Sequence, residues 1–512
     1  MKKLENRYFT NTLTSEMYKI FATHPGMGRA DTLKFFKLLD EDISKCPEGI
    51  TGKRFLWVHL LPFYSKSIKA LLDKNEINQL LISDMNVDSL QKIDLDDIYG
   101  SIAKKLILNK FYDNNFEAFI VGGCVRDNLL RKTPHDYDIT TNALPNEIEL
   151  LFEKTVPTGI KHGTITVIIN NTPFEVTTYR TDGEYLNNRK PKSVKFVTNI
   201  KEDLARRDFT INALAYNPKL GLKDFFYGKE DLKNKIIRCV GIPDKRFNED
   251  ALRILRAIRF SCQLNFEIEI NTLNSIKKNF ILIKNISKER IRDEFSKILL
   301  SPNSFNGACI LKDIGITDLI IPIFKENFNL DYNTLKHNYK FLQFVPNKLS
   351  SKLASFIIAS CNFEGTNNLT QHILKTLHYD NKTIKETLIL VNEFNTPLTL
   401  NRYELKKFIN RVSKELIFDY IDLKKSFLKF NNETLEDINI IEKNIRDILD
   451  KKEPLTIKDL NINGSMLSKE LKLKPGKEIG LILNYLLDKV LQNPKLNIYD
   501  TLINIAKNKY IT

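Results

Sequence analysis

The stretch AFIVGGCVRDNLLRKTPHDYDIT, residues 118–140, decides the fold. Its apolar start, residues 118–121, predicts a short buried strand that ends at Gly122 and Gly123. Glycines let backbone N–H groups approach an anion, and the N-terminus of the helix expected at residues 125–130 favours negative charge. The pattern therefore predicts a cradle for a triphosphate, with an ordinary tight turn as the alternative.

The same stretch ends in two carboxylates, Asp136 and Asp138. If residues 135–139 form a strand, both side chains point to one face, because side chains alternate with a period of two. Two carboxylates on one face are a natural site for two Mg²⁺ ions, with a solvated loop as the alternative for such a pair taken alone. The combination of a glycine phosphate loop, Arg126 and Asp127, and this pair is what nucleotidyl transfer needs. Glu175, in a β-rich run further along, is a candidate third carboxylate, with a surface salt bridge as the alternative.

Residues 203–213 (DLARRDFTINA) indicate a second binding element. On a helix, Asp208 and Asn212 would be i, i+4 neighbours and would present an acceptor and an amide together, which suits the two hydroxyls of a ribose. Arg206 and Arg207 can pair with phosphates through their planar guanidinium groups. A surface helix carrying a cluster of charges is the alternative.

Residues 249–253 (EDALR) place Asp250 and Arg253 at i, i+3, which predicts one helical face for both. A carboxylate only accepts hydrogen bonds and a guanidinium only donates them. Together they match cytosine or adenine, which carry an amine beside a ring nitrogen, whereas uracil and guanine carry a carbonyl at that place. The pair is therefore predicted to select C and A without a template. The alternative is a plain salt bridge worth roughly 0.2–0.5 kcal/mol.

The composition of the chain narrows its function less than these motifs do. The chain has 512 residues, with 78 Lys plus Arg against 63 Asp plus Glu, a formal charge of +15. This excess favours polyanionic partners, with the amino-acid bias of an AT-rich genome as the alternative. No stretch reaches the ~18 apolar residues of a membrane helix, and the N-terminus shows no apolar signal segment. The six cysteines form no C-x-x-C pair, so reduced thiols in the cytoplasm are expected and zinc has no support.

The pattern of residue types divides the chain into three regions. Residues 1–98 carry no catalytic pattern and are expected to form a mostly helical N-terminal extension of unknown role. Residues 99–232 combine β-rich runs with short helices, and the turn NNTP at 170–173 predicts an antiparallel hairpin. Amphipathic helical segments dominate from residue 233 onward. The predicted fold class is therefore α+β.

These motifs together resemble the class II tRNA nucleotidyltransferases, the CCA-adding enzymes, within the polymerase β-like nucleotidyltransferase superfamily. The motifs that carry the resemblance are GGCVRD (122–127), DYD (136–138), RRDFTINA (206–213), EDALR (249–253) and SKERIRDEF (287–295). They follow one another in the order and spacing of the family, and the last resembles the helix that closes its neck domain.

The resemblance implies a fold and an activity. The fold is a small mixed α/β catalytic head (99–232) followed by an all-helical neck (233–299), body (300–392) and tRNA-binding tail (393–512). The activity is addition of C, C and A to the 3′ end of tRNA from CTP and ATP, with release of pyrophosphate. Asp136 and Asp138, with Glu175 as a further ligand, would hold two Mg²⁺ ions.

The resemblance also implies which residues bind the nucleotide. They are Gly122, Gly123, Arg126, Arg207, Asp208, Asn212, Asp250, Arg253 and Arg256. It implies a cytoplasmic enzyme without a membrane partner, and no protein partner is inferred.

Related activities remain as alternatives. Bacterial poly(A) polymerases share these motifs, but TGIKHGTITV (158–167) resembles the CCA-adding form, as does the tail segment IKDLNING (457–464). An enzyme that adds only A differs in a flexible loop, here residues 182–191, in which Asn188 stands where Asp is usual. A non-catalytic RNA-binding protein is a remote alternative, because it would have no physical reason to keep two mutually repelling carboxylates.

Overall fold

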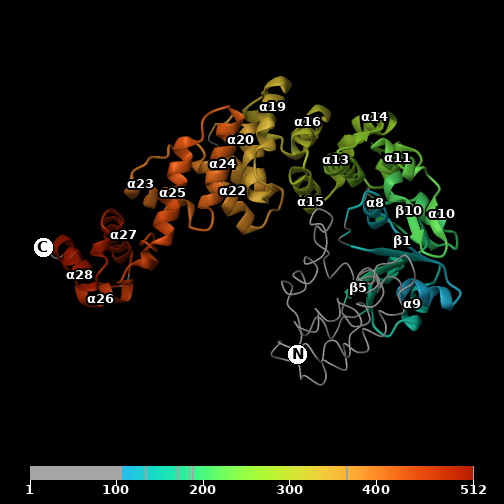
Figure 1. The fold of residues 1–512 in the computed structure, drawn as a ribbon, viewed down its shortest axis with the longest axis horizontal. Helices are drawn as coiled ribbons and strands as arrows, with labels where there is room; N and C mark the ends of the chain where they lie inside the picture. Colours follow the sequence, from blue (N-terminus) through green and yellow to red (C-terminus); the bar gives the residue numbers. More distant parts are fainter. Residues whose placement is uncertain are drawn as a thin grey trace, which may run out of the picture. The chain divides into compact units, whose positions relative to one another are not determined.

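The computed structural model describes residues 106–510, apart from residues 133, 135, 170–171, 184, 187–189, 365–366 and 475. The extension expected at residues 1–98 and the loop residue Asn188 therefore lie outside the described residues. The chain divides into two compact units (Figure 1). Of the described residues, the head unit comprises 106–181, 196–203 and 214–223, and the helical unit comprises 182–195, 204–213 and 224–510.

The head unit is built on one mixed sheet of seven strands in the order β11-β10-β1-β2-β5-β4-β3. The strands are β1 (Ala118–Val121), β2 (Asp138–Thr141), β3 (Thr155–Gly159), β4 (Thr164–Ile169), β5 (Thr172–Thr178), β10 (Leu214–Asn217) and β11 (Gly221–Asp224). Strands β2 and β5 are parallel, whereas β1 is antiparallel to both β2 and β10. The predicted hairpin is confirmed, since β4 and β5 are antiparallel and Ile169 lies opposite Thr172.

Helices cover one face of this sheet. The helix at residues 106–113 and α9 (Pro145–Leu151) supply Ile107, Phe111 and Ile148 to a buried cluster with Ile139 and Val176 of the strands. Because strand side chains alternate between faces, the residues that precede Ile139 and Val176 point to the opposite face. Those preceding residues are acidic, so packing of the core leaves a polar face for chemistry.

Shorter elements lie between these strands in the sequence. They are α8 (Gly123–Leu129), η3 (Ile160–His162), β6 (Arg180–Asp182), β7 (Tyr185–Leu186), β8 (Lys190–Pro191), β9 (Val194–Phe196), α10 (Ile200–Ala205) and η4 (Thr210–Asn212). Helix α8 contacts β1 and β10 of the head unit. Helix α8 therefore lies next to β1, the strand that precedes it in the sequence.

The helical unit consists almost entirely of helices, as the sequence predicted. Its first part contains α11 (Gly228–Asn234), β12 (Ile236–Ile237), α12 (Pro243–Glu249), α13 (Leu252–Leu264), β13 (Glu267–Ile268), α14 (Ile270–Asn279), η5 (Phe280–Asn285) and α15 (Lys288–Leu299). Helix α13 packs against α15 and α16 (Ser304–Ile314). Its apolar stripe, including Ile254, Leu255 and Ile258, is buried, which is why this helix lies at the centre of its neighbours.

The remaining helices follow in chain order. They are α17 (Ile316–Ile320), α18 (Ile323–Asn327), α19 (Tyr332–Tyr339), η6 (Lys340–Gln343), α20 (Leu349–Ser360), α21 (Asn367–Thr376), α22 (Asn381–Glu393), α23 (Arg402–Val412), α24 (Ile417–Phe430), α25 (Glu436–Asp450), η7 (Ile457–Asp459), α26 (Gly464–Leu471), α27 (Lys477–Gln492), η8 (Pro494–Leu496) and α28 (Tyr499–Tyr510). Helix α20 packs against α22 and α24, side by side in Figure 1. Aromatic side chains fill this part of the core, as where Phe341 contacts Phe394 and Phe427.

Two expectations from composition bear on this fold. Five cysteines fall within the described residues, and all five are buried. Within the same part of the chain, no helix combines the length and the apolar character needed to cross a membrane.

Candidate active site

Gly122 turns the chain of the head unit from strand to helix. It follows β1, precedes α8, and has φ 83° and ψ −134°, a conformation that essentially only glycine adopts. Its N–H donates to the Leu214 carbonyl at 3.0 Å and its carbonyl accepts from the Arg126 N–H at 3.2 Å. The predicted strand–Gly-Gly–helix turn is confirmed, and the helix begins at Gly123, earlier than expected.

Arg126 lies beneath this turn. Its side chain is buried, and Nε and Nη2 donate to the two carboxylate oxygens of Asp127 at 2.8 and 3.0 Å. A Cβ added at Gly123 would lie 3.5 Å from Nη2 of Arg126. The guanidinium group is therefore held against the glycine turn by a bidentate ion pair with Asp127.

The predicted carboxylates lie at the start of β2. The strand begins at Asp138, so the expectation of a strand over residues 135–139 was wrong for Asp136, which precedes it. Asp138 lies directly opposite Glu175 in the parallel pairing of β2 with β5. Neighbouring strands are only about 4.8 Å apart, and all three carboxylate residues are exposed. The sheet register thus brings Glu175 beside Asp138.

The chemistry of these side chains suits a hard divalent cation. Carboxylate oxygens are the ligands that Mg²⁺ prefers. Burial raises the pKa of the nearby Cys124 thiol, and the negative charge of Asp138 acts in the same direction. Among the described residues, no three His, Cys, Asp or Glu side chains already converge as a complete metal cage.

Asp208 and Asn212 lie in the helical unit, and their expected placement on one helix was wrong. Asp208 lies in a bend after α10, and Asn212 ends the short 3₁₀ helix η4. The Asp208 carboxylate accepts the N–H of Phe209 at 2.8 Å, a local bond through which Asp favours turns over helix interiors. The two side chains still meet, because Nδ2 of Asn212 donates to Oδ1 of Asp208 at 3.1 Å.

Arg256 of α13 holds the other oxygen of Asp208. Its Nε donates to Oδ2 at 2.8 Å, and its Nη2 also contacts this oxygen. Burial alone would raise the pKa of Asp208, but the charge of Arg256 and the hydrogen bond from Asn212 hold this pKa well below its usual value. Asp208 is therefore an ionised acceptor. Arg256, predicted to bind nucleotide, donates to Asp208, and its contact with a nucleotide stays a prediction.

The expected placement of Asp250 and Arg253 on one helix was also wrong. Helix α12 ends at Glu249, Asp250 is extended with φ −137° and ψ 104°, and α13 begins at Leu252. Oδ1 of Asp250 accepts the Leu252 N–H at 3.0 Å. Such a bond from an aspartate side chain to the backbone two residues on competes with helix formation, and here it accompanies the break in the helix that periodicity predicted.

Asp250 and Arg253 each pair with a residue that the sequence did not single out. Arg290 of α15 donates from Nη2 and Nη1 to the two Asp250 oxygens at 2.8 and 3.3 Å. Nη1 of Arg253 donates to Oε2 of Glu249 at 2.7 Å, and its Nη2 donates to the Arg206 carbonyl at 2.9 Å. The i, i+4 spacing of Glu249 and Arg253 was a usable signal. No short-range sequence pattern predicted the pairing of Asp250 with Arg290, which lies 40 residues away in the sequence.

The phosphate-binding arginines predicted at 206 and 207 belong to the same unit. Arg206 is linked to Arg253 through its carbonyl, and its Nη1 lies 3.8 Å from Oδ2 of Asp182. Arg207 is half-buried, and its N–H donates to the Leu204 carbonyl at 3.2 Å. The helical unit therefore ties the segment of Asp208 to α13 through backbone as well as side-chain contacts.

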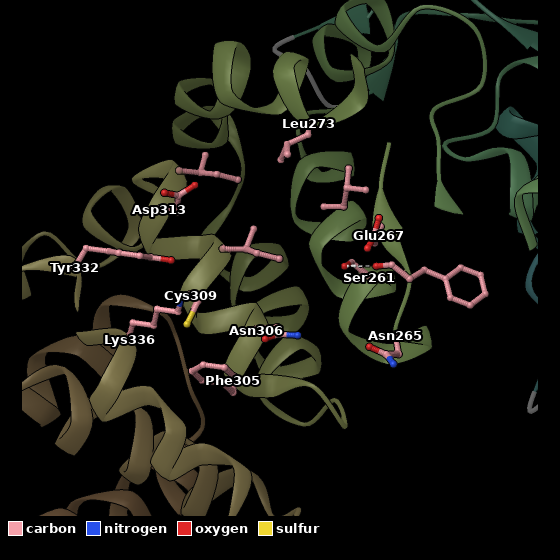
Figure 2. A pocket seen from close by; sticks show the side chains of 14 residues that line it. Ser261, Asn265, Glu267, Leu273, Phe305, Asn306, Cys309, Asp313, Tyr332 and Lys336 are labelled. Atoms are coloured by element: carbon pink, nitrogen blue, oxygen red, sulfur yellow. Dashed lines mark hydrogen bonds between the residues drawn. The ribbon is translucent and has the colours of Figure 1, made fainter. Parts of the chain in front are cut away.

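A separate pocket of about 690 Å³ lies elsewhere in the helical unit. In Figure 2, Cys309 and Asp313 of α16 and Tyr332 and Lys336 of α19 face Glu267 across the opening. The predicted metal and nucleotide residues are not part of its lining.

The fold and the families that the chain matches define a nucleotidyltransferase. Residues 118–238 match the family described as poly A polymerase head domain. Residues 265–328 match the probable RNA and SrmB-binding site of polymerase A, and residues 348–506 match tRNA nucleotidyltransferase domain 2, putative.

Relatives define the family more narrowly. The chain is 37% identical to a CCA-adding enzyme of Ligilactobacillus salivarius over 78% of this chain and 95% of that protein. It is 36% identical to a CCA-adding enzyme of Staphylococcus haemolyticus over 79% and 96%. The crystal structure of the Bacillus stearothermophilus CCA-adding enzyme in complex with CTP matches with a TM-score of 0.65 and 27% identity, over 82% of this chain and 99% of that one. The chain belongs to the CCA-adding enzymes, and it is an enzyme.

Proposed function

We propose that this enzyme adds C, C and A to the 3′ end of tRNA from CTP and ATP, without a template and with release of pyrophosphate. The single observation that supports this most is the register that sets Asp138 opposite Glu175, on the strand that follows the glycine turn and α8. The names of the relatives supply the substrates, because the curated proteins that this chain matches over 95% and 96% of their own length are CCA-adding enzymes.

In the head unit, Asp136 and Asp138 are proposed to hold two Mg²⁺ ions, with Glu175 as a further ligand. Bound there, Mg²⁺ would favour ionisation of the tRNA 3′-hydroxyl and neutralise triphosphate charge. The backbone N–H groups that follow Gly122 and the Arg126 guanidinium are proposed to bind the triphosphate, which they complement in charge.

In the helical unit, Asp208 and Asn212 are proposed to bind the ribose hydroxyls, and Arg207 a phosphate. Asp250 would accept the exocyclic amine of C or A, and Arg253 would donate to the adjacent ring nitrogen. The structure adds a supporting set of ion pairs, Arg256 to Asp208, Arg290 to Asp250 and Glu249 to Arg253. Selectivity would then depend on these pairs, because each fixes the direction of a hydrogen-bonding group.

We also propose the domain assignment that the family implies. The catalytic head spans 99–232, the neck 233–299, the helical body 300–392 and the tRNA-binding tail 393–512. The proposal for the tail rests on the charge of the whole chain, +15, which favours contact with the RNA backbone.

Transfer of A alone, or poly(A) synthesis, is the competing activity, because the head and the next segment match families named after poly(A) polymerase. End-labelled tRNA lacking its CCA end should be incubated with Mg²⁺ and each nucleotide, alone and mixed, and read at single-nucleotide resolution. Growth by C, C and A followed by a stop supports full CCA addition. A lone A on tRNA ending in CC indicates the A-only enzyme, and a long ladder with ATP indicates poly(A) polymerase.

The site assignment has its own test. Asp138→Asn should abolish extension under all conditions and leave tRNA affinity nearly unchanged, because it removes metal-binding charge without burying anything. Glu149→Gln, an exposed carboxylate on α9, is the matched control and should extend tRNA normally. Normal extension by Asp138→Asn would remove the proposed role of this carboxylate.

A further inference from the structure

Tyr227 combines an unfavourable backbone conformation with an exposed side chain. Its φ of 62° and ψ of 27° lie in the left-handed region, which Gly and Asn adopt far more readily than a bulky residue. Its exposed fraction is 75%, so burial of the ring does not offset this cost. Phe363 also has a positive φ, but its ring contacts Phe341 and Phe427.

The surrounding turn imposes the conformation whatever residue occupies position 227. Oδ1 of Asp224 accepts the Gly228 N–H at 2.8 Å, and Oδ2 accepts the Lys229 N–H at 2.9 Å. These bonds tie the start of α11 back across Tyr227. The fold therefore favours Gly or Asn at this position and gains nothing from an aromatic ring there, which points to a role outside folding.

The neighbours of Tyr227 give the surface its chemical character. Phe225 has an exposed fraction of 38%, and Lys229, Lys233 and Lys235 of α11 and its C-terminal cap are all exposed. We call Phe225, Tyr227 and these three lysines the aromatic–basic patch. Glu230 is the one exposed acid within α11, because Asp231 is buried and bound to Arg238 and Thr210.

The aromatic–basic patch is connected to the predicted ribose-binding segment. Helix α11 packs against η4, and the Thr210 hydroxyl of η4 donates to Oδ2 of Asp231 at 2.7 Å. Both elements belong to the helical unit. A ligand on the patch would therefore bind next to elements that already carry nucleotide-binding groups.

We propose that Tyr227 stacks on an unpaired base of the RNA substrate while the lysines of the patch bind adjoining phosphates. An exposed ring stacks on any base, because every base has a π face, and lysines neutralise the backbone. The inference rests on the proposed function only in taking an RNA with an unpaired end as the substrate. It adds a site for this RNA that is distinct from the residues proposed to bind the incoming nucleotide.

The test is equilibrium binding in EDTA, which separates RNA binding from turnover. The probes are tRNA lacking its CCA end, which carries an unpaired 3′ nucleotide, and a blunt RNA duplex of the same acceptor-stem sequence. Tyr227→Asn should weaken tRNA binding about 5- to 100-fold and leave duplex binding unchanged. Its melting temperature should equal or exceed that of the wild type, because Asn accepts the left-handed conformation.

Controls separate stacking from a structural role. Tyr227→Phe should bind tRNA like the wild type, and Tyr332→Asn, another exposed tyrosine, should have no effect. Lys229→Gln and Lys233→Gln should each reduce the slope of log affinity against log salt by about one. Wild-type affinity in Tyr227→Asn, or an equal loss for the duplex, would overturn the inference. If the wild type binds no tRNA at all, the proposed function fails as well.

Discussion

Gly122 shows how much one residue contributes at the smallest scale. A positive φ with ψ −134° is open to glycine alone, and this conformation sends β1 into α8 within a single residue. Gly123 differs, because it lies inside α8 and a Cβ there meets only ordinary contact distances. Two adjacent glycines that look equivalent in the sequence therefore have different structural requirements.

This difference predicts opposite effects of one substitution. Gly122→Ala should lower the free energy of unfolding by about 1–3 kcal/mol, because alanine is forced into a strained conformation. Gly123→Ala should be neutral or stabilise by up to ~1 kcal/mol, because it reduces the freedom of the unfolded chain. Urea denaturation followed by circular dichroism measures both. Equal losses in the two variants would contradict the assignment of strain to Gly122.

The buried pair of Asp208 and Arg256 predicts a pH dependence. The pKa of Asp208 lies below its usual value of 3.8 in the folded protein, opposed by burial but dominated by Arg256 and Asn212. The stabilisation is therefore present above about pH 4 and is lost as the pH falls below it. Arg256→Met should cost about 2–3 kcal/mol at pH 7, a reduced figure for a buried pair because Arg256 is partly exposed.

Urea denaturation of the wild type and Arg256→Met at pH 7 and pH 3 tests this, and the difference should shrink at pH 3. Lys277→Met breaks an exposed pair with Asp313 and serves as the control, with a cost below ~1 kcal/mol. A pH-independent cost of Arg256→Met would mean that lost packing, and not the charge of Asp208, is responsible.

The break between α12 and α13 is the feature that matters most at the scale of elements. It moves Asp250 out of a helix and lets its carboxylate accept both the Leu252 N–H and the Arg290 guanidinium. Helix α13 then carries Arg253, Arg256 and Arg259 one turn apart, each within an ion pair to a different element, namely α12, the bend at Asp208 and α15. The helix therefore positions the proposed base-selecting and ribose-binding groups together.

Arg290 should accordingly affect selectivity more than folding. Arg290→Gln frees the Asp250 carboxylate from its bidentate partner, so we expect the preference for CTP over UTP, measured as the ratio of kcat/KM, to fall roughly 10-fold. Arg253→Gln should reduce the same ratio, because it removes the proposed donor to the ring nitrogen.

Arg292→Gln is the matched control, because Arg292 lies on the same helix but pairs with Asp293. It should leave the ratio unchanged. An unaltered CTP preference in Arg290→Gln would show that Asp250 needs no partner to select the base.

At the scale of the whole molecule, we expect folding to be independent of the proposed metal site. The three proposed metal-binding carboxylates are exposed, and each unit has its own buried core. EDTA should therefore abolish nucleotide addition without lowering the melting temperature or the affinity for tRNA. Added Mg²⁺ should restore activity, measured as extension of labelled tRNA. A large drop in melting temperature on chelation would show that metal binding is coupled to folding.

The sequence by itself determined the local features of this protein. The apolar run, the glycine pair and the hairpin turn predicted β1, α8 and the β4–β5 hairpin, because strand periodicity and glycine geometry act over a few residues. The amphipathic pattern likewise predicted the long helical region. Where Asp208 and Asp250 formed local hydrogen bonds, periodicity predicted helices that the structure breaks, because such bonds compete with helix formation.

Only the tertiary structure decided which side chains meet. Asp138 lies opposite Glu175 through sheet register, Asp250 meets Arg290 across 40 residues, and Asp208 meets Arg256 across 48. These long-range pairings follow from how buried apolar faces pack, and no short-range sequence pattern encodes that packing. The residue types of the proposed site could thus be recognised from the sequence, whereas their partners were set by long-range burial of the core.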